Sequence, residues 1–407
     1  MTGLPAGHRE PLVDALRGAA LLGILLVNVQ SFDWGPGNPL GYFAQPPAPL
    51  EQALFFMLAA LVAGKSYTIF ALLFGFGFTL QTRRMLLLVQ RRRAAATALY
   101  LRRLGFLLGA GVLHAALLYF GDILVSYALC ALFLVPLAWA RTRTLLRATR
   151  AAWCVAAAAL LFWSGVDHFL AEPATGVIPA ELSSARAIYL DAGYAGQLAQ
   201  RWHDGLALEL DGAWLAWPQI VALMLLGALA ARLGWLRRPQ RHPRVWRSAA
   251  RIGIGIGLPC ALLGGWLHLE TIRNLPDRAF GADALLLGFS GLLTFAYIAA
   301  AVRWRSSAVL QWGLRWLAPA GRMPLTNYIA QSVAMGALLS GWGLRLGASA
   351  SRLDLTLGAI VFYGLQLLVS RALLARTGQG PLEALWRRFT YRGLDRRGST
   401  AFRPAAP

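Results

Sequence analysis

Ten long apolar segments constrain this chain more than any other feature of its sequence. A helix needs about 20 mostly apolar residues to cross a hydrocarbon core of about 30 Å, and each of the ten segments has 17 residues or more. None alternates apolar and polar residues with a period of two, which argues against a transmembrane barrel. The segments are Val13–Val29, Gln52–Leu80, Leu99–Phe120, Ile123–Ala140, Ala151–Phe169, Ala213–Leu233, Ala250–Leu269, Gly281–Val302, Leu325–Leu346 and Leu355–Leu374. We therefore predict an all-α, polytopic integral membrane helix bundle with about ten transmembrane helices.

The second segment is too long for one crossing, because as a single helix it would measure about 43 Å. The stretch Ala63-Gly64-Lys65-Ser66 is the natural place for a break. We expect residues 51–62 to form an outer or tilted helix and residues 66–80 to enter the bilayer.

The charged residues are distributed unevenly between the two sides of the predicted membrane. The formal net charge is +21, although only 14% of the residues are charged, against the roughly 25% that is usual for soluble domains. With the N-terminus placed in the cytoplasm, the inner connections hold 32 arginines and four acidic residues, and the outer connections hold six arginines and fourteen acidic residues. This positive-inside distribution predicts that both termini are cytoplasmic. The inner connections are 1–17, 81–103, 141–150, 232–251, 303–322 and 371–407.

Runs of basic residues such as Arg91-Arg92-Arg93 lie beside apolar segments. Membrane topology and contact with anionic lipid headgroups account for them, so we predict the lipid bilayer as a partner and no nucleic acid. Binding of an anionic cytoplasmic ligand stays open.

The chain divides into three parts by composition. Residues 1–170 form an N-terminal transmembrane bundle, residues 171–212 form an acidic extracytoplasmic loop, and residues 213–407 form a C-terminal transmembrane part. The loop has helical character from Glu181 to Leu210, and it is either a lid or a cover over the outer mouth. The chain contains three cysteines, all in apolar segments outside this loop. Their spacing is not that of metal ligands, so we predict no metal site.

His114 is the strongest candidate for a functional residue, because ionisable side chains inside a membrane are costly. Arg103 lies eleven residues earlier, about three helical turns and about 16 Å away on nearly the same face. That arrangement suits a ligand with an anionic head at the inner surface and a reactive end within the membrane, as in acyl-CoA. The alternative is a histidine that only bonds a neighbouring helix.

Asp122 follows His114 near the outer surface. On a straight helix it would be about 12 Å from His114, too far for a hydrogen bond, although Gly121 could let the chain turn. Asp122 is therefore either a helix N-cap or a functional carboxylate.

Other polar residues at the membrane boundaries complete the candidate set. Asp14 and Arg17 can pair along one helix face, and Asn327 and Gln331 share a face at the start of the ninth segment, where Arg322 precedes them. Asn327 and Gln331 either line a cavity or hold helices together.

Two further polar residues lie in or beside the first two apolar segments. Asn28, late in the first segment, needs hydrogen-bond partners if it is buried. Lys65 is either a substrate contact or a side chain that extends to the membrane interface.

These motifs resemble the YeiB-like family of bacterial inner-membrane proteins, whose C-terminal part is called domain of unknown function 418. The resemblance covers nearly the whole chain. The matching stretches are Val13–Val29, Gly64–Phe78, His114, Gly121–Leu124, Gly321–Ser332, Gly341–Gly343 and Gly380–Thr390.

The resemblance implies a multi-pass protein of the bacterial inner membrane, with a fold similar to that of transmembrane acyltransferases. The acyltransferase-3 group opens its first span with the pattern that Asp14 to Gly18 show here, and its third span has the basic residue and histidine that Arg103 and His114 match. Members of that group tend to carry a histidine late in the first span, where this chain has Asn28 and no histidine.

The expected function is transfer of an acyl group, in particular acetyl, from cytoplasmic acyl-CoA to a small-molecule, glycan or lipid acceptor. We expect His114 to act as general base, with Asp122 as a second catalytic candidate. The phosphates would be held by Arg103, Arg17 and Arg322. The oxyanion would accept a hydrogen bond from Asn327 or Gln331. Further candidates for contact with the substrate are Asp14, Asn28 and Lys65. The alternatives are a small-molecule or lipid transporter and a non-catalytic membrane protein. A homo-oligomer stays open.

Overall fold

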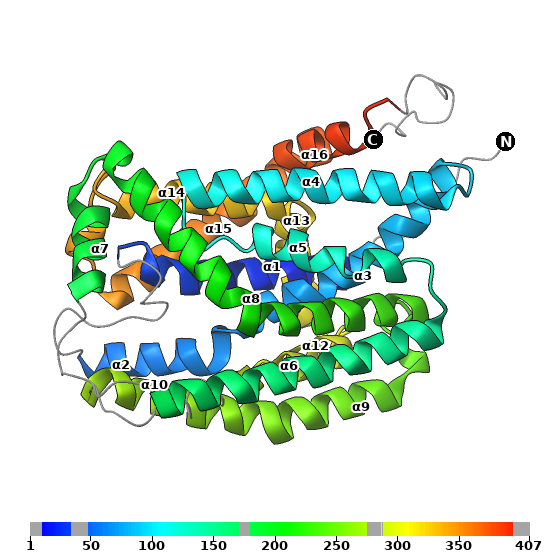
Figure 1. Cartoon of the computed structure of the whole chain (residues 1–407), viewed down its shortest axis with the longest axis horizontal. Coiled ribbons are helices and arrows are strands. Elements are labelled where there is room, and N and C mark those ends of the chain that lie inside the picture. Colours follow the sequence, from blue (N-terminus) through cyan, green and yellow to red (C-terminus); the bar gives the residue numbers. More distant parts are fainter. Residues whose placement is uncertain (1–9, 34–47, 171–179, 275–285, 287, 394–407) are drawn as a thin grey trace.

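The chain forms a bundle of helices, many of which run along its long axis (Figure 1). The computed structural model describes residues 10–33, 48–170, 180–274, 286 and 288–393. Within these residues all regular secondary structure is helical and no strand is present, as the apolar segments predict.

The helices of the first half begin with α1 and end with the longest helix, α8. They are α1 (Pro11–Asn28), α2 (Pro49–Met57), α3 (Lys65–Leu88), α4 (Arg93–Leu117), α5 (Leu124–Leu132), α6 (Thr142–Leu170), α7 (Ala180–Asp191) and α8 (Tyr194–Leu233). Those of the second half are α9 (Pro243–Ile252), α10 (Leu258–Asn274), α12 (Leu293–Arg303), α13 (Ala308–Arg322), α14 (Pro324–Leu339), α15 (Arg352–Thr377) and α16 (Pro381–Tyr391).

Shorter helical turns adjoin these helices. The π-helical turns are η2 (Leu58–Val62) and η5 (Gly253–Gly257), and the 3-10 turns are η1 (Val29–Ser31), η3 (Val135–Leu137), η4 (Pro239–Arg241) and η6 (Leu346–Ala348).

Seven helical stretches among the described residues are long and apolar enough to cross a membrane. They are Pro11–Ser31, Pro49–Leu88, Arg93–Leu117, Thr142–Val166, Gly212–Leu233, Pro243–Glu270 and Arg352–Thr377. Three expected segments form shorter helices: α5 has 9 residues, α14 has 16, and the apolar stretch Gly288–Arg303 also has fewer than 18. Nine helical residues extend only about 13 Å, so α5 alone does not cover a hydrocarbon core.

The predicted break in the second apolar segment is confirmed. The π-helical turn η2 ends at Val62, and α3 begins at Lys65. Gly64 lies between them with a φ of 78°, a left-handed conformation that glycine adopts without the steric cost of a Cβ atom.

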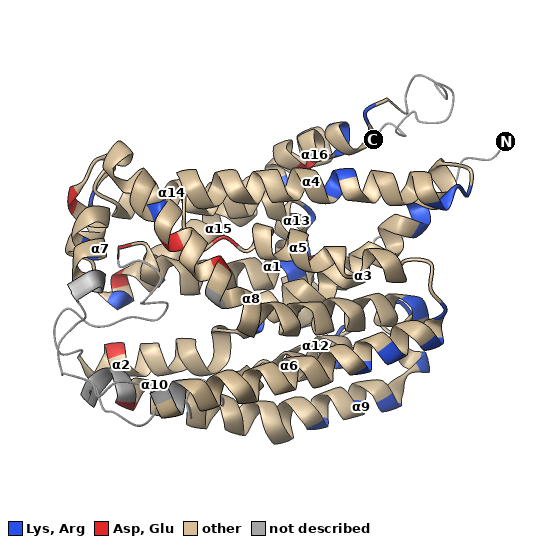
Figure 2. Ribbon diagram, in the orientation of Figure 1, with Lys and Arg blue, Asp and Glu red and all other residues tan. Residues whose placement is uncertain are grey.

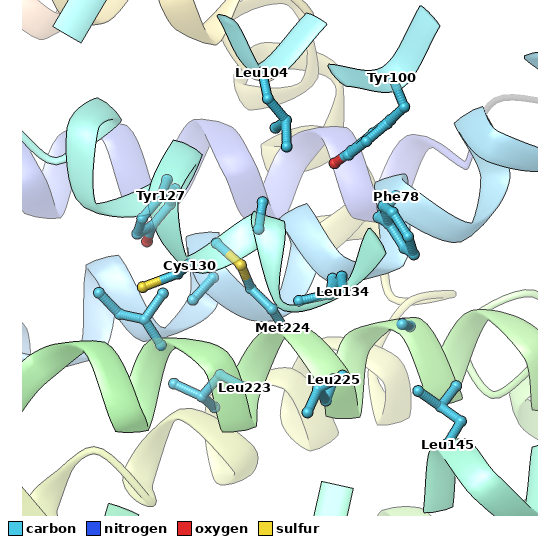
Figure 3. Close-up of a cluster of buried hydrophobic side chains, with 14 of the residues drawn as sticks. Phe78, Tyr100, Leu104, Tyr127, Cys130, Leu134, Leu145, Leu223, Met224 and Leu225 are labelled. Atoms are coloured by element: carbon cyan, nitrogen blue, oxygen red, sulfur yellow. The ribbon is translucent and has the colours of Figure 1, made fainter. Parts of the chain in front are cut away.

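Helices α3 and α8 pack closely through glycines. A Cβ atom at Gly75 would lie 1.8 Å from the carbonyl oxygen of Met224, and one at Gly227 would lie 1.8 Å from that of Leu72. Small residues at such crossings let two helix backbones approach closely. Inside a membrane the hydrophobic effect does not drive helices together, so this close packing is what holds them. The core around this contact includes Phe78, whose ring meets that of Tyr100 edge-on with a centroid distance of 4.8 Å (Figure 3).

The charges separate along the bundle. Most of the arginines lie at the end where α3 finishes and where α4, α6 and α9 begin, whereas many of the acidic residues lie toward the opposite end, near α2, α7 and α10 (Figure 2). The predicted helical character of the acidic loop is confirmed within its described part, where α7 is followed by the first turns of α8.

Candidate functional site

His114 lies in the last turn of α4 and is 1% exposed. The helix ends three residues later, and the backbone amides of Leu118 and Tyr119 both donate to the carbonyl oxygen of His114. The chain then reverses its direction before α5 begins at Leu124. Gly121 permits this turn, because a Cβ atom there would lie 2.5 Å from the ring of Tyr119.

Asp122 returns to His114 because of this reversal. Its Oδ1 atom lies 2.7 Å from Nδ1 of His114, and Asp122 is only 6% exposed. The separation of about 12 Å that a straight helix would give does not occur, because α4 ends at Leu117 and the chain turns before Asp122, as the alternative based on Gly121 allows. The expected capping role also appears, because the amide of Val125 donates to Oδ2 of Asp122 over 2.7 Å. Asp122 thus orients His114 and anchors the start of α5.

Ser332 approaches His114 from α14, on the opposite side of the imidazole ring. Its Oγ atom lies 2.7 Å from Nε2 of His114, and Ser332 is 3% exposed. An ionised carboxylate only accepts hydrogen bonds, so Asp122 favours the tautomer that carries its proton on Nδ1. Nε2 is then an acceptor for the serine hydroxyl. A serine, a histidine and a carboxylate in this order are the groups needed to activate a hydroxyl as a nucleophile.

Two tyrosines enclose the hydrogen-bonded series Ser332–His114–Asp122, called the histidine series below. The ring of Tyr328 lies with its centroid 4.7 Å from that of His114, and the ring of Tyr119 lies 6.4 Å away. The Tyr119 hydroxyl bonds Oγ of Ser31 over 2.6 Å, and that of Tyr328 donates to the carbonyl oxygen of Gly121 over 3.4 Å. The three polar side chains are therefore shielded from bulk water.

Glu209 is a second carboxylate near the series. It lies on α8, half-buried, and accepts the hydroxyl of Ser126 on both oxygens at 3.0 and 2.8 Å. Burial raises the pKa of Glu209, and the nearby charge of Asp122 raises it further. Sequence reasoning missed Glu209 because it stands in the acidic outer segment without any distinguishing motif.

Arg103 lies toward the arginine-rich end of α4, where α16 covers it. Its guanidinium carbon is 3.4 Å from the centroid of the Trp386 ring, and the indole Nε1 of Trp386 donates to the Arg103 carbonyl oxygen over 2.9 Å. Such a cation–π contact fixes the guanidinium plane. The positive charges of Arg17 and Arg387 also act on Arg103, so arginines from α1, α4 and α16 converge at this end.

Two other predicted residues lie at the same end in different settings. Arg17 bonds Asp14 at 3.2 Å, as its spacing predicts, and also donates to the carbonyl oxygen of Leu73. Arg322 is exposed and donates to the carbonyl oxygen of Gly378 at 3.4 Å.

Asn327 and Gln331 connect α14 to α15. The amide of Asn327 donates to the carbonyl oxygen of Ala320 and to Oγ of Ser370, and the amide of Gln331 donates to the side-chain oxygen of Gln366. Both residues are 3% exposed. Of the two readings of this polar face, these bonds correspond to the one in which it holds helices together. Gln331 directly precedes Ser332, so the same turn of α14 both joins α15 and carries the hydroxyl that meets His114.

Lys65 and Asn28 lie apart from the histidine series. Lys65 is 1% exposed and donates to the carbonyl oxygen of Ala59 at 3.1 Å and to Oγ of Ser290 at 2.7 Å, so its ammonium group is held among α3, η2 and the segment of Ser290. Asn28 is half-buried, and its carbonyl oxygen accepts the hydroxyl of Ser31.

Comparison with known proteins identifies the family. The chain is 30% identical over 419 residues to the uncharacterized protein YeiB of Escherichia coli (strain K12), covering 95% of this chain and 97% of that protein. This chain belongs to the YeiB family. It is also 26% identical over 409 residues to the uncharacterized protein YxaH of Bacillus subtilis (strain 168), with 94% of each chain covered.

The family described as "Protein of unknown function (DUF418)" matches residues 230–393. In this member of the YeiB family, Ser332 and Trp386 fall within the matched region, whereas His114, Asp122 and Arg103 precede it. The hydrogen-bonded series is therefore assembled from both parts of the chain. No solved structure matches the chain at a significant level.

Proposed function

We propose that this protein is an integral membrane acyltransferase in which Ser332, His114 and Asp122 perform the transfer. The observation that supports this proposal is the pair of 2.7 Å contacts on the two nitrogens of His114, one to a carboxylate and the other to a hydroxyl. Asp122 holds the tautomer and stabilises the imidazolium that forms, so that Nε2 can take a proton from Ser332.

The reaction proceeds in two balanced steps. In the first, Oγ of Ser332 attacks the carbonyl carbon of an acyl thioester, its proton moves to Nε2 of His114, and the carbon–sulfur bond breaks. The departing thiolate takes the proton back from His114, which leaves an acyl ester on Ser332. In the second step an acceptor hydroxyl or amine attacks that ester, its proton passes to Nε2, and the Ser332 oxygen leaves and regains the proton.

The donor in this proposal is acyl-CoA, in particular acetyl-CoA, approaching from the arginine-rich end. Arg103 is held flat on Trp386, and Arg17 and Arg387 are near enough for their charges to act on it. Arginine is well suited to phosphate groups. Along α4, Arg103 and His114 are about 16 Å apart, so an extended ligand could place its phosphates at one and its thioester at the other.

The proposed topology places the arginine-rich end in the bacterial cytoplasm. The sequence-based positive-inside pattern and the charge separation in Figure 2 both support that orientation. We further propose that α5, the stretch Gly288–Arg303 and α14 complete ten passes in the inner membrane, with both termini in the cytoplasm. His114 then lies near the outer leaflet, and the acceptor reaches it from the membrane or the outer side.

The enclosing tyrosines give the acyl ester a long lifetime in this proposal. Tyr119 and Tyr328 keep water away from Ser332, and exclusion of water prevents hydrolysis of a reactive intermediate. A substrate must displace at least one of the two rings to enter.

The experiment that tests the proposal is acyl transfer in proteoliposomes loaded with radiolabelled acetyl-CoA, assayed against extracted membrane lipids and glycans as acceptors. We expect Ser332→Ala and His114→Ala to abolish transfer. Ser340→Ala is the matched control, because Ser340 is also a buried serine, eight positions further along, at the end of α14. Equal activity in Ser332→Ala and Ser340→Ala would contradict the proposal.

A further inference from the structure

A cavity of about 310 Å³ lies between α1, α3 and α12, away from the histidine series. Its walls are mostly aliphatic, with Lys65 as the charged member. The residues that line it are Leu16, Ala19, Ala20, Leu22, Gly23, Leu26, Leu61, Val62, Lys65, Ser66, Ile69 and Tyr297. The opposite face of α1 presents Leu21 and Leu25 to the cluster that contains Tyr119 and Tyr328, so α1 separates the cavity from His114.

The cavity lies among helices that are long and apolar enough to cross a membrane, and part of its lining is at the surface. Both α1 and α3 belong to stretches long and apolar enough to cross a membrane. Ala19 is exposed, and Leu22 and Leu26 are half-buried, so the lining reaches the lipid-facing surface of α1. An apolar space of this kind is not filled by water, because water needs polar partners. A hydrocarbon chain is the natural occupant.

Lys65 supplies the second observation. Its ammonium group has three donors, and two of them meet neutral acceptors, the Ala59 carbonyl oxygen and Oγ of Ser290. Among the described residues no carboxylate lies within ion-pairing distance of Lys65, although its side chain is 1% exposed. A buried charge without a counter-charge is costly inside a membrane. An anionic group from a ligand would provide that counter-charge.

The depth of Lys65 suits a lipid phosphate. Lys65 begins α3, and Arg83 lies eighteen residues later near the arginine-rich end, which places the two about 27 Å apart along the helix. With the boundary on that side taken at Arg83, a hydrocarbon core of about 30 Å places the other boundary close to Lys65. The amino end of α3 also carries a partial positive charge that attracts anions.

The cavity extends from that boundary toward the membrane centre. Gly23 of α1 lies against Val62 and Ser66, beside Lys65, whereas Leu16 and Ile69 pack together nearer the arginine-rich end. From Leu26 to Leu16 the wall formed by α1 is about 15 Å long. The charged end and the apolar length of the cavity are therefore arranged like the head and tail of a lipid.

We propose that this cavity binds a membrane phospholipid, with its phosphate at Lys65 and one acyl chain between Leu26 and Leu16. The lipid belongs to the leaflet at the arginine-poor end. The site is independent of acyl transfer, because α1 separates it from Ser332, His114 and Asp122.

The test uses the full-length protein in nanodiscs containing phosphatidic acid with a photoreactive diazirine in its acyl chain. After irradiation, mass spectrometry of the α1 peptide should show labelling around Leu22 and Leu26. Ala19→Trp, which places an indole in the cavity, should lower that labelling by about tenfold. Ala372→Trp is the matched control, since Ala372 is an exposed alanine on the membrane helix α15. Equal labelling in the two variants would overturn the proposal.

The phosphate contact is tested separately with two further probes that carry the same chain. Diacylglycerol lacks the phosphate and should label α1 about tenfold less than phosphatidic acid does, and Lys65→Met should remove this difference. Because the probe comparison uses the wild-type protein, it holds even if Lys65→Met does not fold. A free fatty acid that displaces phosphatidic acid would show that a carboxylate occupies the site. Labelling by diacylglycerol equal to that by phosphatidic acid would show that the cavity binds acyl chains without recognising the phosphate. Either result overturns the assignment.

Discussion

Nδ1 of His114 lies 2.7 Å from Oδ1 of Asp122, although the end of α4 and a reversal of the chain separate the two residues. The carboxylate leaves Nε2 on the other side of the ring free to accept the hydroxyl of Ser332. A histidine that served only to join helices would need one polar contact. The carboxylate on its second nitrogen is what prepares this imidazole for proton transfer.

Asp122→Asn should lower the kcat of acyl transfer by about 10³–10⁴-fold, because an amide no longer fixes the required tautomer of His114. The asparagine oxygen still accepts the amide of Val125, so the start of α5 is retained. Asp204→Asn is the matched control, since Asp204 is a buried carboxylate outside the site that accepts hydrogen bonds from Tyr189 and Gln200 and contacts the exposed ring of the adjacent His203. A comparable loss in both variants would indicate a general effect of buried charge and would count against an orienting role for Asp122.

Arg103→Gln should raise the KM for acetyl-CoA by about tenfold or more and change kcat much less, because it removes a phosphate contact made before the chemistry. Arg102→Gln provides the control, since Arg102 is the preceding residue on α4 and its side chain is exposed. The measurement is initial rate against acetyl-CoA concentration for both variants. If Arg103→Gln and Arg102→Gln raise the KM equally, the loss of one positive charge explains the change, and a specific phosphate contact by Arg103 is contradicted.

Asp33 makes stability depend on pH. It is 4% exposed, and burial raises the pKa of its carboxyl from 3.8 to about 6. Between these values the folded protein binds the proton more tightly than the unfolded chain, so stability falls as pH rises from about 4 to about 6. Asp33→Asn should therefore stabilise the protein by up to about 3 kcal/mol at pH 7.5, with the gain vanishing near pH 4.

Thermal unfolding in detergent at the two pH values measures this difference. Asp191→Asn is the control, because Asp191 is exposed and pairs with Arg345 at the surface, where ion pairs contribute little. If the difference in unfolding temperature between Asp33→Asn and the wild type were the same at both pH values, the raised pKa of Asp33 would be contradicted.

Gly75→Ala should destabilise the bundle by about 1–3 kcal/mol, because its methyl group would meet the Met224 carbonyl oxygen at 1.8 Å and force α3 away from α8. Gly105→Ala should leave stability unchanged or raise it, since nothing lies within 4 Å of a Cβ atom there and alanine favours helix. The thermal midpoints of the two purified variants, measured side by side, decide the matter. Equal midpoints would mean that α3 and α8 are not held at this crossing.

Local features of the fold could be predicted from the sequence. The length of the second apolar segment required a break, and Gly64 was the residue able to provide it. The pairing of Asp14 with Arg17 followed from their spacing on one helix face. Spacing alone does not separate the glycines of α4: a Cβ atom at Gly105 or Gly109 would meet open space, whereas one at Gly111 would lie 2.7 Å from the backbone nitrogen of Val125. Sequence spacing does not reveal which face of a helix meets a neighbour.

The candidate site was predictable only in part. His114 stood out because it is an ionisable residue in an apolar segment. Its bond to Asp122 depends on where α4 ends, and hydrophobicity did not mark that end because the apolar run continues to Phe120. Ser332 lies 218 positions away from His114, and only the packing of α14 against α4 brings the two together.

The acyl ester on Ser332 gives the most direct test of the proposed chemistry. The purified protein is incubated with acetyl-CoA and no acceptor, quenched in acid, digested, and the peptide containing Ser332 is weighed by mass spectrometry. We expect an added acetyl group of about 42 Da on Ser332 in the wild type and in Ser340→Ala, and none in His114→Ala, because the hydroxyl must lose its proton to attack. An active enzyme whose Ser332 peptide stays unmodified would contradict the role of Ser332 as nucleophile.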